Sequence, residues 1–74
     1  MIPVDMRGVP MLKRLETILK AWKELEPGDA IRLCNDREPA PLQVLFRTRE
    51  RGKFDWIYEK QGPTEWVAII RRKE

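Results

Sequence analysis

The hydrophobic positions of this chain change their spacing along its length, and each change predicts a different element. Residues 2–6 are short and β-permissive, and Gly8 and Pro10 then punctuate a turn. From residue 11 the apolar positions recur at spacings of three and four, with charged residues on the other side. The members of this stripe are Met11, Leu15, Ile18, Leu19, Trp22 and Leu25. We therefore predict a strand, a turn and an amphipathic helix, which Pro27-Gly28 ends.

A weaker alternation follows that turn. Ile31 and Leu33 fall on one face of residues 30–34, and Cys34 shares the other face with Arg32, as in a strand with one covered face. Behind the prolines at positions 39 and 41, an apolar stripe predicts a second, shorter helix that closes at Gly52.

The last third of the chain reads as a β-hairpin. Apolar and polar residues alternate along 54–59 and again along 66–71, on either side of Gln61-Gly62-Pro63. If the turn centres on Gly62, Tyr58 lies opposite Trp66 and Trp56 lies opposite Ala68. We expect all three tryptophans, including Trp22 of the first helix, to belong to the core.

The element order predicts one α/β (α+β) two-layer sandwich over residues 1–74. In this β-α-β-α-β-β arrangement, two helices cover one face of a four-stranded mixed sheet, and the first two strands are parallel. The other face stays uncovered. Its residues include Ile57, Val67 and Ile69, each of which contributes about 1.5 to 3 kcal/mol when fully buried. A homodimer or a protein partner would cover this face.

Composition removes several kinds of chemistry. Cys34 is the single cysteine of the 74 residues and there is no histidine. An internal disulfide, the ordinary zinc ligand sets and histidine acid–base catalysis are therefore excluded, and we expect no metal and no cofactor. The longest apolar run, residues 66–70, is too short to cross a membrane. The first residues lack the pattern of a secretory signal, so we expect a cytoplasmic protein.

Positive charge raises the possibility of nucleic-acid binding. The net charge is +3, and basic residues cluster within 47–53 and 71–73. The 15 basic and 12 acidic residues are nevertheless interleaved for most of the length, which is typical of a solvated surface. Because Arg49 and Arg51 also suit a helix C-terminus and the aromatics are needed in the core, nucleic acid is the less favoured partner.

The loops after the first two strands carry the best candidate ligand site. Ligands of parallel α/β units collect at the carboxyl ends of strands, beside helix N-termini. The candidate ligand-binding residues are Asp5, Arg7, Gly8, Asn35, Asp36, Arg37 and Glu38. Their two guanidinium groups suit a carboxylate or another small anion. A local Asp5–Arg7 salt bridge, with Asn35 or Asp36 as a helix cap, explains the same residue types without any ligand and is the favoured interpretation.

The motifs together resemble the family DUF2249, a branch of the TusA/SirA-like superfamily. The resemblance rests on Asp5-x-Arg7-Gly8, Glu26-Pro27-Gly28-Asp29, Asn35-Asp36-x-x-Pro39-x-Pro41-Leu42, Trp56 and Trp66. It implies a TusA-like fold. The sulfur carriers of that superfamily hold a reactive cysteine in a Gly-Leu-x-Cys-Pro-x-Pro turn, which this branch lacks. Aligned on Gly8, the slot holds Met11, which we interpret as a packing residue. Family members usually read Asn-Asp-His-Asp-Pro where this chain has Arg37 and Glu38.

The resemblance and the missing catalytic residues favour a non-catalytic accessory module over an enzyme. Such a module would engage a protein partner or a small anion in a bacterial redox or sulfur-linked context, as the resemblance implies. Two alternatives stay open. One is a divergent sulfur-transfer protein in which Arg32 and Arg37 help Cys34, although a cysteine inside a strand lacks the helix N-terminus that would lower its pKa. The other is a weak nucleic-acid binder.

Overall fold

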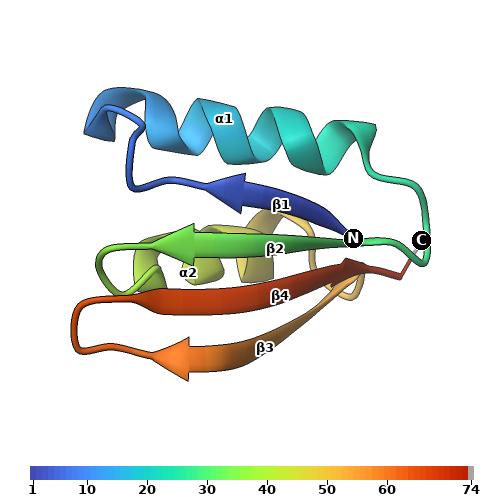
Figure 1. Ribbon diagram of the computed structural model, residues 1–74. Coiled ribbons are helices and arrows are strands. Elements are labelled where there is room, and N and C mark those ends of the chain that lie inside the picture. Colours follow the sequence, from blue (N-terminus) through green and yellow to red (C-terminus); the bar gives the residue numbers. More distant parts are fainter. Residues whose placement is uncertain (74) are drawn as a thin grey trace.

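The computed structural model describes residues 1–73, and its elements follow the predicted order (Figure 1). Over this range the elements are β1 (Ile2–Asp5), α1 (Met11–Glu24), β2 (Ala30–Asn35), α2 (Ala40–Arg49), β3 (Phe54–Gln61) and β4 (Trp66–Arg72). The α1 helix begins where the spacing of apolar residues changes, directly after Pro10. In α2, Pro41 occupies one of the first helical positions, where its missing N–H has no intrahelical partner to lose.

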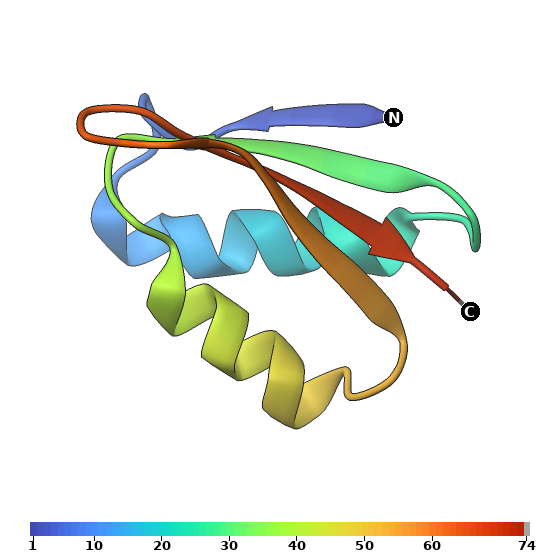
Figure 2. The same ribbon diagram turned by 90° about the horizontal axis from the view of Figure 1, so that it is seen from below.

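The four strands form one mixed sheet in the order β1-β2-β4-β3. The β1 and β2 strands are parallel, whereas β4 runs antiparallel to both of its neighbours. Both helices lie on the same side of the sheet, so the molecule has two layers (Figure 2). The predicted α+β sandwich is therefore confirmed, and the carboxyl ends of β1 and β2 meet at one edge.

The core fills the space between the sheet and the two helices. Its largest fully buried side chains are Phe46, Ile18, Ile31, Leu33 and Ile70. The ring of Phe46 meets those of Trp22, Phe54 and Trp56 edge to face, with centroids 5.0, 5.4 and 6.0 Å away. Edge-to-face contacts add stabilisation beyond the burial of area. Phe46 of α2 thus contacts both α1 and β3.

The register of the hairpin differs from the predicted one. Tyr58 lies opposite Ala68, and Trp66 pairs with Gln61, so the predicted pairing of Tyr58 with Trp66 is wrong by two residues. The turn occupies residues 62–65, where the Gly62 N–H donates to the Glu65 carbonyl at 2.8 Å. It therefore lies further along the chain than a turn centred on Gly62. An irregularity between Tyr58 and Lys60 accommodates the change.

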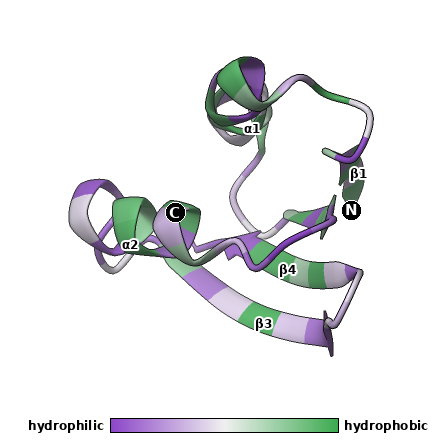
Figure 3. Cartoon of the chain, turned by 90° about the vertical axis from the view of Figure 1, so that its left-hand side faces the viewer, coloured by the Kyte–Doolittle hydropathy of each residue, from purple (hydrophilic) through white to green (hydrophobic). Residues whose placement is uncertain are grey.

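The uncovered face of the sheet is less apolar than its alternation suggests. Ile57 is 62% exposed and Ile69 is partly buried, but Val67 keeps only 4% exposure within this single chain. Arg32 on β2 pairs with Glu59 on β3 at 3.0 Å across this face. Hydrophilic and hydrophobic segments alternate along β3 in Figure 3. A partner on this face would therefore find two accessible isoleucines among charged groups.

Candidate functional site

The residues predicted as one ligand site divide into two clusters. Asp5 and Arg7, at the end of β1, face the uncovered side of the sheet. Asn35 and Asp36, at the end of β2, turn toward α1, where both contact Arg14. The two loops lie at the same edge of the sheet, as predicted, but their side chains lie on opposite sides of it.

The first cluster is a chain of charges that we name the Arg7 network: Asp5, Arg7, Lys60 and Glu65. The Arg7 guanidinium donates to both carboxylate oxygens of Asp5, at 3.0 and 2.9 Å, and to Glu65 Oε2 at 3.1 Å. Lys60 Nζ donates to the other Glu65 oxygen at 2.9 Å. The predicted Asp5–Arg7 salt bridge is confirmed. The hydrogen bonds from Arg7 lower the pKa of Asp5 to about 2, and Lys60 lowers that of Glu65.

Cys34 lies beneath the Arg7 network. Its Sγ donates to Glu65 Oε2 at 3.6 Å, and the residue is 9% exposed. Burial is the main cause that raises the pKa of the thiol, and it outweighs the opposing charge of Arg7. The arginines expected to assist the thiolate lie elsewhere, because Arg32 pairs with Glu59 and Arg37 lies 3.9 Å from Asp36. At neutral pH this cysteine is a protonated thiol and a poor nucleophile.

The second cluster centres on Arg14, which is 14% exposed. Its Nη1 donates to Asn35 Oδ1 and to Asp36 Oδ1, both at 2.9 Å, and its Nε donates to the Val9 carbonyl at 2.8 Å. The hydrogen bond from Arg14 lowers the pKa of Asp36. The predicted helix cap is wrong, since Pro39 precedes α2 with no side-chain capping bond. A charge-assisted bond to Arg14 is stronger than a bond to a neutral N–H.

An apolar groove opens beside this cluster, between the N-terminal halves of α1 and α2. We name it the edge groove; its volume is about 360 Å³. It is lined by Met6, Met11, Leu15, Ile18, Leu33, Pro39, Pro41, Leu42 and Leu45, with Arg14, Asn35, Arg37 and Glu38 as its polar residues. Small-molecule sites are typically concave, mostly apolar and furnished with a few polar groups. Three of the predicted ligand residues thus line a groove: Asn35, Arg37 and Glu38.

Met11 lies at the mouth of the edge groove. It is 54% exposed, so its interpretation as a packing residue is wrong. Met11 is the first residue of α1, about two turns before the apolar stripe reaches the core at Ile18.

The remaining sequence features find structural roles. Arg72 does not join a basic patch with Arg71, because its Nη1 donates to the Trp22 carbonyl at 2.9 Å while its guanidinium lies over the Trp22 ring. Within residues 1–73, no group of three His, Cys, Asp or Glu side chains is placed to hold a metal ion. In the same range, neither helix is long and apolar enough to cross a membrane.

These observations define a class: a small α+β sandwich in which the loops after β1 and β2 open beside an apolar groove. The chain belongs to the DUF2249 family, whose model, described as "Uncharacterized conserved protein (DUF2249)", matches residues 3–72. It is also 34% identical over 71 residues to a protein of Archaeoglobus fulgidus named "Putative sulfur carrier protein". That match covers 95% of this chain and 80% of the relative. No solved structure matches the chain. The family resemblance is thereby confirmed.

Proposed function

We propose that this protein is a non-catalytic binding module of sulfur-linked metabolism and that its edge groove binds a small organic anion. The observation that carries this proposal is the groove itself, which opens beside Met11 where the resembling carriers present a thiol. The similarity to a protein named as a sulfur carrier supports the sulfur-linked context. The burial of Cys34 supports recognition over sulfur transfer.

The lining of the edge groove sets the chemistry of its ligand. Most of the lining is apolar, so the body of the ligand is apolar too. Arg37 lies on the rim with its side chain 66% exposed. Its neighbour Asp36 is held by Arg14 at 2.9 Å and lies 3.9 Å from Arg37. The Arg37 guanidinium is therefore placed to receive a carboxylate or a sulfur oxyanion, for which its geometry is suited.

A series of straight-chain carboxylates tests the proposal. We expect amide chemical-shift changes in residues 35–38 and at Met11 when the labelled protein is titrated with acetate, butanoate and hexanoate. Affinity should rise along the series, because each buried methylene contributes up to about 0.8 kcal/mol, or roughly fourfold. Two-dimensional NMR measures both the location and the affinity.

The controls use two exposed arginines. Arg37→Gln should weaken hexanoate binding about tenfold or more, since a hydrogen bond to a charged group contributes about 1.5 to 3 kcal/mol. Arg51→Gln makes the same change outside the groove and should leave binding unaltered. Two results would show that the edge groove is not the anion site. One is an affinity that does not change with the length of the carboxylate, and the other is an equal loss of hexanoate affinity in both variants.

Sulfur transfer through Cys34 is the second candidate function. The name of the Archaeoglobus fulgidus relative, a putative sulfur carrier protein, favours it. The geometry around Cys34 opposes it, because the thiol is buried, carries a raised pKa and is covered by the Arg7–Glu65 pair. A donor would have to displace that pair before it reached the sulfur.

A further inference from the structure

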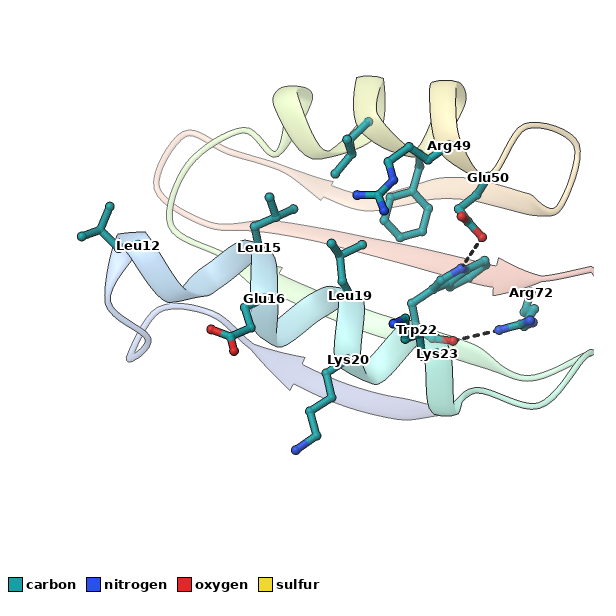
Figure 4. A pocket seen from close by; sticks show the side chains of 12 residues that line it. Leu12, Leu15, Glu16, Leu19, Lys20, Trp22, Lys23, Arg49, Glu50 and Arg72 are labelled. Carbon is teal, nitrogen blue, oxygen red and sulfur yellow. Dashed lines mark hydrogen bonds between the residues drawn. The ribbon is translucent and has the colours of Figure 1, made fainter.

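We propose that a second groove, between α1 and the C-terminal half of α2, binds an acidic amphipathic helix of a partner protein. This helix groove has a volume of about 840 Å³ and is shown in Figure 4. Its apolar lining consists of Leu12, Leu15, Leu19, Trp22, Leu45 and Phe46. The inference goes beyond the small-anion site, although the two grooves share Leu15 and Leu45.

The walls of the helix groove expose more apolar surface than the fold requires. Leu12 is 97% exposed and Leu15 is 48% exposed. Figure 4 shows Leu15 and Leu19 pointing from α1 toward α2. At the far end, Trp22 is fixed because its Nε1 donates to Glu50 Oε1 at 2.8 Å. Burying such leucines against a partner would recover the free energy that they lose by facing water.

The shape of the groove favours a helix as its occupant. Leu12, Leu15 and Leu19 follow one another at spacings of three and four, and such a ridge packs against another helix. From Leu12 to Trp22 the wall is about 15 Å long, at about 1.5 Å per residue, which matches roughly three turns. A helix pairs its own backbone groups, whereas an extended segment between two helices would leave N–H and C=O groups without partners.

The charges on the rim favour an acidic occupant. Lys20, Lys23 and Arg49 line the groove, and none of them forms an ion pair with another residue of the described range. Of the two acidic lining residues, Glu50 is engaged by Trp22. A second copy of this chain would bring the same basic rim and the same net charge of +3. Charge complementarity therefore selects a different, acidic protein over self-association.

A displayed peptide library tests the charge preference on the full chain. The library holds 14-residue helices with apolar residues at spacings of three and four, and with Glu or Lys varied at the flanking positions. We expect selection to enrich Glu over Lys. Enrichment of Lys, or no enrichment of any helix, would overturn the proposal.

Variants then locate the bound peptide. Leu12→Asp should weaken binding of the selected peptide about tenfold or more, because it places a charge where the bound peptide would bury a leucine. Arg49→Glu should weaken it as well, and more so at low salt. The matched controls Ile57→Asp and Arg71→Glu change exposed residues of the uncovered sheet face and should leave affinity unchanged. Circular dichroism verifies that each variant is folded.

Two results would place the occupant elsewhere. Weakening by Ile57→Asp in place of Leu12→Asp would assign the binding to the sheet face and overturn the proposal. A dimer in sedimentation that Leu12→Asp dissociates would identify the occupant as a second copy, which also overturns it. Because Leu12 does not line the edge groove, Leu12→Asp should keep hexanoate binding, so failure of this inference is distinguishable from failure of the proposed function.

Discussion

Arg7 connects the loop after β1 to the β3–β4 hairpin. Its guanidinium donates two hydrogen bonds to Asp5 and one to Glu65, which lies 58 residues away in the sequence. Glu65 in turn contacts the thiol of Cys34. The sequence suggested that the Arg7 guanidinium binds a ligand. In the structure this group instead forms hydrogen bonds with Asp5 and Glu65, which cover Cys34 on the uncovered face of the sheet.

The pKa of Asp5 depends on its hydrogen bonds with Arg7 and can therefore be used to test for them. The pKa of Asp5 is lowered from 3.8 to about 2, chiefly by the side-chain hydrogen bonds from Arg7. Because the pKa is lower in the folded protein, Asp5 stabilises the fold at pH values above the pKa of aspartate in the unfolded chain, about 3.9. This contribution is lost as the pH falls through the folded pKa of about 2. We expect NMR of the Asp5 carboxyl carbon to show a midpoint near 2.

The Arg7→Gln variant is the control for this titration. Without the guanidinium, the pKa of Asp5 should return toward 3.8. A midpoint near 3.8 in the unmodified protein would contradict the Arg7 network.

At the scale of elements, the hairpin turn sets the register of β3 and β4. Gly62 has a φ of +67°, and a Cβ at this position would come within 2.9 Å of Trp66 Cζ2. Gly28 has a φ of +90°, but a Cβ there would meet nothing within 4 Å. The two glycines thus share a left-handed backbone and differ in their surroundings.

Alanine at each glycine separates backbone strain from crowding. Gly28→Ala should lower the free energy of unfolding by roughly 1 to 2 kcal/mol, the cost of a left-handed residue with a Cβ. Gly62→Ala should cost about 1 to 3 kcal/mol more, because the new methyl also collides with the Trp66 ring. Urea denaturation measures both, and equal losses would show that the turn does not pack against Trp66 as described.

The elements were predictable where a pattern repeats within one segment. The spacing from Met11 to Trp22 identified α1 because successive turns of one helix present the same face to the core. The hairpin register was not predictable, since it depends on a four-residue turn closed between Gly62 and Glu65. The expected cap of α2 failed for a similar reason. Arg14, which lies 22 residues earlier in the sequence, donates a hydrogen bond to the Asp36 carboxylate, so Asp36 does not cap α2.

For the whole molecule, topology was predictable and the division of the site was not. The β1–β2 pairing brings both loops to one edge, as expected of parallel strands. The side of the sheet on which each side chain lies depends on partners that are distant in the sequence. Arg7 forms a hydrogen bond with Glu65, whereas Asn35 accepts one from Arg14. Both grooves lie between α1 and α2, and no motif signals them. The exposed Leu12 at a polar position of the α1 face was the one available clue.

The arrangement of the whole molecule separates its cysteine from its grooves. Cys34 lies on the uncovered face of the sheet beneath the Arg7 network, while both grooves lie on the helical side. Met11, at the start of α1, is exposed and lines the edge groove. We therefore propose, as the central claim, that this protein recognises a ligand and does not carry sulfur.

Mass spectrometry of the intact chain after incubation with a cysteine desulfurase and cysteine tests this claim most directly. The Met11→Cys variant, which places an exposed thiol at the start of α1, verifies that sulfur is delivered, and Cys34→Ser identifies any modified position. We predict that Cys34 of the unmodified protein gains no sulfur under conditions in which Met11→Cys does. A persulfide on Cys34 of the folded protein would contradict the account.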